Sequence, residues 1–344
     1  RITIRNCDLS WIGGGLQYWK TRKDGTRYPV RFGNAIEFWS GARDHLVERN
    51  RIWEVYDAAL TNQGNGDDSH QINIIYRDNV IWNSEYSFEF WNRPASVVTS
   101  NIVFEFNTCV DAGICWSHAQ RPNPNGAHLM FYHNPSKTSD FIVRNNIFCR
   151  SSDRCTRMWN VWDGAPTLSN NLYWSPDKPI MRWTEKTDYA QSEFVRYQSE
   201  LRLDQGSFVG EPQFVNPAAR DYRLKPGSPA ERIGFKPFDY TQAGVYGDPA
   251  WVARARSLTY PELVLPPSPP PPPPLTVEED FELLRDGATP TGMSVYPGSK
   301  GGYAGTATDL GAGGSKHCFR VQDAPGQENP WDPHFYYLSL IHIC

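Results

Sequence analysis

The sequence predicts an all-β chain: a parallel β-helix, or solenoid, then a proline-rich linker and a truncated β-sandwich. Two observations predict the solenoid: a strand-like pattern that recurs through residues 1–175, and an asparagine at the same place in most repeats. Short strands of this kind cannot each bury a hydrophobic face alone, but stacked coils can. A change in composition after a run of prolines predicts the separate sandwich. The alternative is a single β-sandwich in which the asparagines recur by chance.

Each repeat consists of an alternating strand, a polar residue, and an apolar residue two places further on. The polar position is occupied by Cys7, Asn50, Asn79, Asn107, Asn146 and Asn171, at spacings of 43, 29, 28, 39 and 25 residues. Asparagine tolerates left-handed backbone geometry at a sharp bend, and stacked asparagine side chains can hydrogen-bond from coil to coil. The two longest spacings carry extra loops, residues 17–33 and 117–139, and part of the second loop can form a strand.

The repeats resemble those of right-handed parallel β-helix proteins of the pectate-lyase-like superfamily, over residues 1–175. Residues 176–260 are expected to follow as a closing segment with a short helix within 189–203, where Phe194, Tyr197 and Leu201 share one face. Within it, residues 210–235 resemble the part that closes the C-terminal end of many such proteins. The resemblance implies a fold rather than one activity, because this superfamily includes lyases, hydrolases, epimerases, tailspikes and adhesins.

The C-terminal part of the chain reads as a linker and a second domain. Residues 261–275 form a linker in which "PPSPPPPPP" predicts a stiff polyproline II spacer. Residues 276–338 resemble the opening strands of a laminin-G-like jelly-roll, an incomplete β-sandwich. Residues 339–344, "SLIHIC", resemble a translated sequencing adapter, so we expect a non-native tail.

The composition narrows the classes of partner. The net charge of −4 gives no general reason to expect nucleic acid, and no apolar run is long enough to span a membrane. Aromatic residues make up 14% of the chain, with 13 tryptophans, which suits either a core or the flat faces of sugars. We therefore expect a monomer that binds polysaccharide. The chain begins inside a strand pattern without a signal peptide, so we expect a fragment of a secreted, cell-surface or periplasmic protein.

The tripeptide Glu-Phe-Trp occurs twice, at residues 37–39 and 89–91, and predicts a candidate active site. Strand alternation places Glu37, Glu89, Trp39 and Trp91 outward on one sheet. Two coils separate the glutamates, or ~10 Å, which suits the acid and base of an inverting glycosidase. The same alternation also predicts outward residues that bind the sugar: Asn62 between the glutamates, then Arg157 and Trp159 further along. Two alternatives remain open: sugar contact without catalysis, and ordinary solvated surface.

The loop 17–33 supplies a second hypothesis. Its basic residues include Lys20, Arg22 and Arg27, interleaved with aromatics, and would suit an anionic, uronate-rich polysaccharide. The resemblance implies that a lyase would use a Lys or Arg base there, often with Ca²⁺. A solvated basic loop is the alternative.

No metal site or other cofactor is predicted, although two features leave room for one or for acid–base chemistry. Asp67 and Asp68 could hold Ca²⁺, but they lack regular ligand spacing. The loop histidines His118, His128 and His133 are weaker candidates for acid–base roles. The absence of a CxxC pair argues against structural zinc. Cys149 and Cys155 could form a disulfide or remain free thiols.

Overall fold

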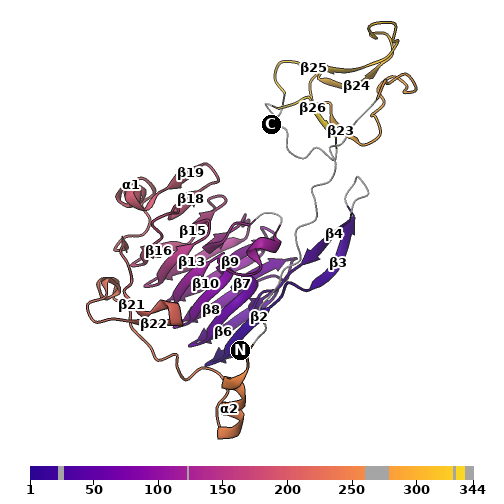
Figure 1. Ribbon diagram of the computed structural model, residues 1–344. Helices are drawn as coiled ribbons and strands as arrows, with labels where there is room; N and C mark the ends of the chain where they lie inside the picture. Colours follow the sequence, from indigo (N-terminus) through magenta and orange to yellow (C-terminus); the bar gives the residue numbers. More distant parts are fainter. Residues whose placement is uncertain (22–26, 122–123, 260–278, 328–330, 338–344) are drawn as a thin grey trace. The chain divides into compact units, whose positions relative to one another are not determined.

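The structure, a computed structural model, describes residues 1–21, 27–121, 124–259, 279–327 and 331–337, and most of its regular structure is β-strand (Figure 1). The chain divides into two compact units. The larger consists of Arg1–Gly15 and Arg31–Leu263, and the smaller of Leu16–Val30 and Val264–Cys344. Among the described residues, no helix has the length and apolar character needed to cross a membrane. The predicted linker 261–275 and tail 339–344 lie outside the described residues.

The larger unit contains two large sheets in which strands from successive repeats lie side by side. The six-stranded sheet consists, in spatial order, of β1 (Thr3–Arg5), β6 (Ala42–Glu48), β8 (Gln71–Arg77), β10 (Val98–Glu105), β13 (Lys137–Arg144) and β16 (Thr167–Ser169). All its strands are parallel. Each strand of this sheet is separated from the next, along the chain, by strands of the other sheet.

The twelve-stranded sheet contains the two longest strands of the molecule, β7 (Arg51–Asn65) and β9 (Val80–Arg93), which pair in parallel. Its other strands are β2 (Asp8–Ile12), β5 (Ile36–Phe38), β11 (Thr108–Ala112), β12 (Ala127–Phe131), β14 (Ile147–Ser151), β15 (Arg154–Met158), β17 (Leu172–Trp174), β18 (Met181–Trp183), β19 (Thr187–Tyr189) and β20 (Phe208–Val209). Its pairs are parallel except β18 with β19. Because β9 pairs with both β11 and β12, the sheet has two arms beyond it.

The asparagine column predicted from the repeats is present and buried. Each side-chain oxygen accepts from the backbone N–H one repeat earlier: from Cys7 to Asn50 at 2.9 Å, and from Asn79 to Asn107 at 3.0 Å. The side-chain nitrogens of the middle members donate to the next asparagine. The left-handed backbone expected at the asparagine occurs one residue earlier, at Asn6, Arg49, Asp78, Phe106, Asn145 and Asn170. The bend at that residue turns the asparagine side chain inward.

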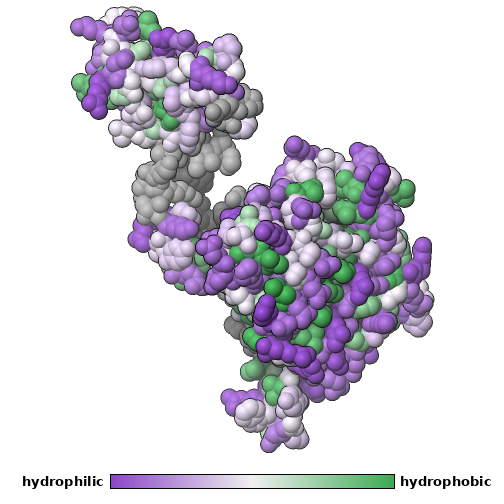
Figure 2. Space-filling model, turned by 180° about the vertical axis from the view of Figure 1, so that it is seen from behind, coloured by the Kyte–Doolittle hydropathy of each residue, from purple (hydrophilic) through white to green (hydrophobic). Residues whose placement is uncertain are grey.

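Residues of both sheets pack in one hydrophobic core. Tyr76 of the six-stranded sheet contacts Phe88 of the twelve-stranded sheet with ring centroids 5.4 Å apart, and Phe104 lies 5.0 Å from the same ring. The positions expected to be apolar in the repeat are in this core, among them Val47, Ile52, Ile81, Val143 and Phe148. The face of the larger unit seen in Figure 2 is mostly hydrophilic with smaller hydrophobic patches, in agreement with the mean hydropathy of −0.58.

Charges alternate across the outer face of the six-stranded sheet. One row of partners consists, in order, of Arg5, Glu48, Arg77, Glu105 and Arg144. Glu48 lies 3.1 Å from Arg5 and 2.8 Å from Arg77, and Glu105 lies 2.8 Å from Arg144. Each charge in the row therefore has only opposite charges as neighbours in the adjacent strands.

Residues after 175 close the end of the sheets and then return along one side. The predicted helix is present as α1 (Phe194–Leu201), preceded by a 3-10 turn at Gln191–Glu193, with Phe194 and Tyr197 buried. The hairpin of β21 (Phe214–Asn216) and β22 (Asp221–Leu224) and the 3-10 helix Pro229–Ile233 pack on the outer side of β9, β11, β14 and β17. Residues 210–235, whose sequence resembles a closing part, pack on this outer side.

Three smaller features complete the described chain. Another helix, α2, spans Pro249–Ser257. The smaller unit contains the hairpin of β3 (Leu16–Thr21) and β4 (Arg27–Arg31), and the antiparallel pairs β23 (Met293–Tyr296) with β26 (His334–Tyr337) and β24 (Tyr303–Ala307) with β25 (Cys318–Gln322). The 3-10 turns His118–Gln120 and Pro217–Ala219 lie in loops. Cys149 and Cys155, whose pairing was left open, are buried free thiols.

Candidate functional site

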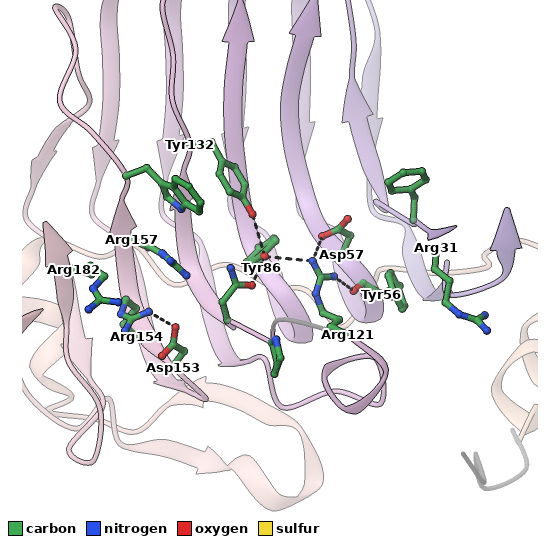
Figure 3. Close-up of a pocket in the computed structure, with 14 residues that line it drawn as sticks. Arg31, Tyr56, Asp57, Tyr86, Arg121, Tyr132, Asp153, Arg154, Arg157 and Arg182 are labelled. Carbon is green, nitrogen blue, oxygen red and sulfur yellow. Dashed lines mark hydrogen bonds and ion pairs between the residues drawn. The ribbon is translucent and has the colours of Figure 1, made fainter. Parts of the chain in front are cut away.

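A cleft of about 730 Å³ lies on the twelve-stranded sheet, in the larger unit (Figure 3). Five arginines, three tyrosines and two aspartates contribute to its lining, together with a tryptophan and a phenylalanine. These residues are Arg31, Phe32, Tyr56, Asp57, Tyr86, Arg121, Pro124, Asn125, Tyr132, Asp153, Arg154, Arg157, Trp159 and Arg182. Cationic and aromatic side chains therefore dominate the cleft.

Arg121 lies at the centre of a hydrogen-bonded network in the cleft (Figure 3). Its guanidinium donates to the Tyr56 carbonyl at 2.9 Å, to Asp57 Oδ1 at 3.1 Å and to the Tyr86 hydroxyl at 3.3 Å. The Tyr86 and Tyr132 hydroxyls are 3.3 Å apart, which extends the network across the sheet. The network joins β7, β9 and the segment after β12 to the loop that carries Arg121.

Fully buried Glu85 anchors that loop to β9. Its Oε1 accepts from the Asn125 backbone at 2.9 Å, and its Oε2 lies 3.0 Å from His118 Nδ1. Arg121 Nε lies 3.5 Å from Glu85 Oε1. One carboxylate therefore holds three points of the loop and positions Arg121 over the sheet.

The acidity of the groups in the network follows from their burial. Burial raises the pKa of Asp57, although the neighbouring Arg121 opposes this shift. Burial lowers the pKa of Arg121, but the charges of Asp57 and its other acidic neighbours more than offset this, so the net shift is upward. Burial raises the pKa of Tyr132 to about 12 and that of Tyr86 well above its usual value. Both tyrosines are thus protonated hydroxyl groups that can donate hydrogen bonds.

Glu37 and Glu89 lie beside this network on one face of the sheet, as the alternation predicts. Glu37 is the register partner of Thr61, and Thr61 is the partner of Glu89, so two strand spacings separate the glutamates. Glu89 is only 6% exposed and accepts from Gln63 Nε2 at 3.1 Å. Burial raises its pKa well above the ordinary value, and the charges of Asp57 and Glu37 raise it further.

Glu37 has a different environment from Glu89. It is exposed, and its Oε2 accepts from Asn34 Nδ2 at 2.7 Å. The two carboxyl groups therefore differ in solvent access although they share a face, which is the asymmetry that an acid and a base require.

The prediction that Asn62 lies between the glutamates is wrong. Asn62 aligns with the core residues Phe38 and Phe90, is fully buried, and accepts from the Tyr76 hydroxyl at 2.7 Å. The pairing of β7 with β9 shifts between Val55 and Ala58, and this irregularity moves the strand by one residue. A one-residue shift exchanges the two faces of a strand, so Thr61 takes the predicted place.

The predicted tryptophans form two aromatic pairs at the ends of the strands. Trp39 and Trp91 pack edge to face with centroids 5.4 Å apart. Trp159 lies 5.3 Å from Tyr132, and the Arg157 guanidinium lies 5.1 Å from the Trp159 ring. Trp39 and Trp159 are exposed, so faces of both pairs are available to a ligand.

Residues 114–118, which precede the strand of the next repeat, do not form a strand themselves. Ile114–Ser117 form a turn before the 3-10 turn His118–Gln120, so Cys115 and Ser117 are not on the sheet. The strand of that repeat is β12, within the loop 117–139, and it places Met130 beside Glu89. The fifth strand follows the prediction, since Arg157 pairs with Met130 and lies on the same face.

The basic loop 17–33 forms the hairpin of β3 and β4. Lys20 Nζ lies 5.8 Å from the Tyr18 ring, and the Arg27 guanidinium lies 5.3 Å from the Trp19 ring. Arg22 lies outside the described residues. Lys20 and Arg27 belong to the smaller unit, whereas the cleft belongs to the larger.

No group of three or more His, Cys, Asp or Glu residues suited to a metal occurs among the residues described. Asp67 and Asp68 lie in the turn after β7. His128 is buried, and burial lowers its pKa to about 4, which leaves a neutral ring bonded to Ser87.

Several residues of the cleft are absent from the sequence-based predictions: Asp57, Tyr86, Arg121, Tyr132, Arg154 and Arg182. Tyr86 lies three residues before Glu89 of the second Glu-Phe-Trp tripeptide, and Arg121 lies in the loop 117–139. Both are therefore close to features that the sequence analysis used. No sequence feature pointed to Arg154 and Arg182, because they come from separate repeats.

Comparisons of the chain with protein-family models, with curated proteins and with solved structures find no match.

Proposed function

We propose that this protein hydrolyses a polysaccharide bound in the cleft, with two residues beside the cleft, Glu89 and Glu37, as general acid and general base. The observation that carries the proposal is their register on one face, combined with the burial of Glu89 and the exposure of Glu37. A general acid must hold its proton near neutral pH, and burial together with the charge of Asp57 raises the pKa of Glu89 in that direction.

The spacing supports inversion at the cleaved bond. Two strands at ~4.8 Å each separate the Cα atoms by ~10 Å. Inverting glycosidases place their carboxyl groups ~6.5–9.5 Å apart, with room for a water, whereas retaining ones need ~5–5.5 Å. In this mechanism Glu89 protonates the leaving oxygen, and Glu37, on the solvent side, activates the water.

The proposed fold is a right-handed parallel β-helix, and a glycan would lie across its coils. The chain passes alternately through the two sheets, and each repeat pairs in parallel with the next, which supports coils stacked along one axis. Trp39, Trp91 and Trp159 are the proposed stacking surfaces for sugar rings, and Arg157 a polar contact. As an exported protein, it would meet polysaccharide outside the cell.

A second candidate, elimination by a polysaccharide lyase, is favoured by the five arginines of the cleft. A lyase must neutralise a uronate carboxylate, which guanidinium groups do well. It also needs a base, and the raised pKa values of Tyr86 and Tyr132 disfavour a tyrosinate in that role. We therefore rank elimination second.

The test is release of reducing ends from neutral and acidic polysaccharides, with the ultraviolet absorbance of unsaturated uronate read in parallel. Reducing ends without new absorbance, lost in Glu37→Gln and Glu89→Gln, would support hydrolysis by the pair. New absorbance that survives both substitutions would overturn it in favour of elimination. Binding without cleavage would make the cleft a glycan-binding site only.

A further inference from the structure

Three arginines, Arg154, Arg157 and Arg182, gather on one side of the cleft (Figure 3). Arg154 and Arg157 belong to β15, and Arg182 belongs to β18, where it is the register partner of Arg157. Glu89, Met130 and Arg157 follow one another on the same face of neighbouring strands. Arg157 is therefore ~10 Å from Glu89 along the sheet, at ~4.8 Å per strand.

The guanidinium groups of this cluster are incompletely satisfied. Arg154 is only 7% exposed, and neither its Nε nor that of Arg182 makes a well-aligned hydrogen bond in the described structure, although Asp188 Oδ1 lies within 3.5 Å of both. A buried donor without a partner is costly, and a guanidinium has five N–H groups to satisfy. Burial lowers the pKa of Arg154, the charges of Asp153 and Asp188 oppose this shift, and those of Arg182 and Arg157 add to it.

Carboxylates of the hairpin between β18 and β19 occupy the rest of the cluster. Glu185 accepts two hydrogen bonds from Arg157, at 2.8 and 2.5 Å. Asp188 Oδ1 lies 3.3 Å from Arg182 Nε and 3.5 Å from Arg154 Nε, and Asp153 pairs with Arg154. The Glu185 side chain is 30% exposed, and the residue has a φ of +57° in a tight turn, so it reaches the arginine from the solvent side.

We propose that Arg154, Arg157 and Arg182 form a subsite for an acidic group of the glycan, a carboxylate or a sulfate, which displaces Glu185 from Arg157. A planar guanidinium binds such groups through two parallel hydrogen bonds, which is the arrangement that Glu185 already makes. Because the cluster lies two to three strands from Glu89, the acidic group belongs to a sugar beyond the one that is cleaved. The inference rests on the proposed function only in that the cleft binds a glycan.

The experiment measures binding of matched neutral, uronate and sulfated oligosaccharides to the full chain by calorimetry, with Glu89→Gln present so that nothing is cleaved. Acidic oligosaccharides should bind at least tenfold more tightly than neutral ones, and the uronate and sulfated arms identify which group fits. Arg157→Gln and Arg182→Gln should each remove most of that difference between acidic and neutral oligosaccharides. The matched control is Arg144→Gln, an arginine paired with Glu105 on the outer face of the other sheet.

A further variant tests displacement without removing a cation. Glu185→Gln should tighten binding of acidic oligosaccharides several-fold and leave neutral ones unchanged, since it removes the competing carboxylate. Equal binding of acidic and neutral oligosaccharides, unaffected by any of these substitutions, would overturn the subsite and leave the proposed function standing. Absence of binding to all three classes would overturn both.

Discussion

Arg121 Nη2 donates a hydrogen bond of 3.1 Å to Asp57 Oδ1, which ties the loop after β11 to the irregular part of β7. Both residues act on Glu89: the charge of Asp57 raises the pKa of that carboxyl, and the charge of Arg121 lowers it. The two members of the pair can be removed separately, so their effects on Glu89 can be measured one at a time.

Glu89→Gln should lower kcat by about 10²–10⁴-fold, since an amide of the same shape cannot deliver a proton. Glu37→Gln should have a loss of similar size, because it removes the carboxylate that is proposed to activate the water. The control is Glu105→Gln, which changes a carboxylate on the outer face of the other sheet. Initial rates of reducing-end release measure the effect, and full activity of either cleft variant would contradict the assignment.

Asp57→Asn should move the high-pH limb of the activity profile to lower pH. The general acid works only while protonated, so activity falls as the pH rises through the pKa of Glu89. The charge of Asp57 raises that pKa, and its removal therefore lowers it. The pH dependence of kcat gives the measurement, and a limb that stays in place would show that Glu89 is not the acid.

Arg121→Gln should move the same limb in the opposite direction. The guanidinium lowers the pKa of Glu89, so its removal should raise that pKa. The substitution also leaves Asp57 without its ion pair. Breaking a largely buried ion pair in this way is destabilising, so the melting temperature should fall as well. Limbs that shift in the same direction in both variants would contradict the proposed electrostatics.

Asn107→Ala should destabilise the larger unit. The backbone and side-chain nitrogens of Asn79 both donate to Asn107 Oδ1, at 3.0 Å each, and both donors would lose this acceptor. Each buried group left unpaired costs about 1–3 kcal/mol, so we expect a loss of about 3 kcal/mol or more. Urea unfolding followed by circular dichroism measures it, with exposed Asn65→Ala as control. Equal stability of the two variants would show that the column contributes little.

The repeats could be predicted from the sequence because each of them contains the same short pattern of residues. Asn50, Asn79 and Asn107 recur beside apolar residues, and their hydrogen bonds to one another follow from stacking. The side of the sheet on which each glutamate lies could also be predicted, because it depends only on alternation within a short strand. The prediction for Asn62 was wrong because the register shift between Val55 and Ala58 interrupts that alternation within one strand.

The cleft itself could not be predicted from the sequence, because its residues come from distant parts of the chain. Asp57 lies in the irregular segment, and Arg121 reaches it from a loop that Glu85 holds through a buried carboxylate. Arg154 and Arg182 come together only when their strands pair through β15 and β18. Asp57 and Arg121 are far apart in the sequence, and so are Arg154 and Arg182, so no short segment predicts that they meet.

The alternating row from Arg5 to Arg144 restricts how this molecule can lengthen or shorten. Loss of one repeat, such as the one that contributes Arg77, would bring Glu48 and Glu105 into adjacent strands and set two negative charges against each other. Loss or duplication of two successive repeats would keep every neighbour opposite in sign. Insertions or deletions inside the row therefore preserve its alternation of charge only when they add or remove an even number of repeats.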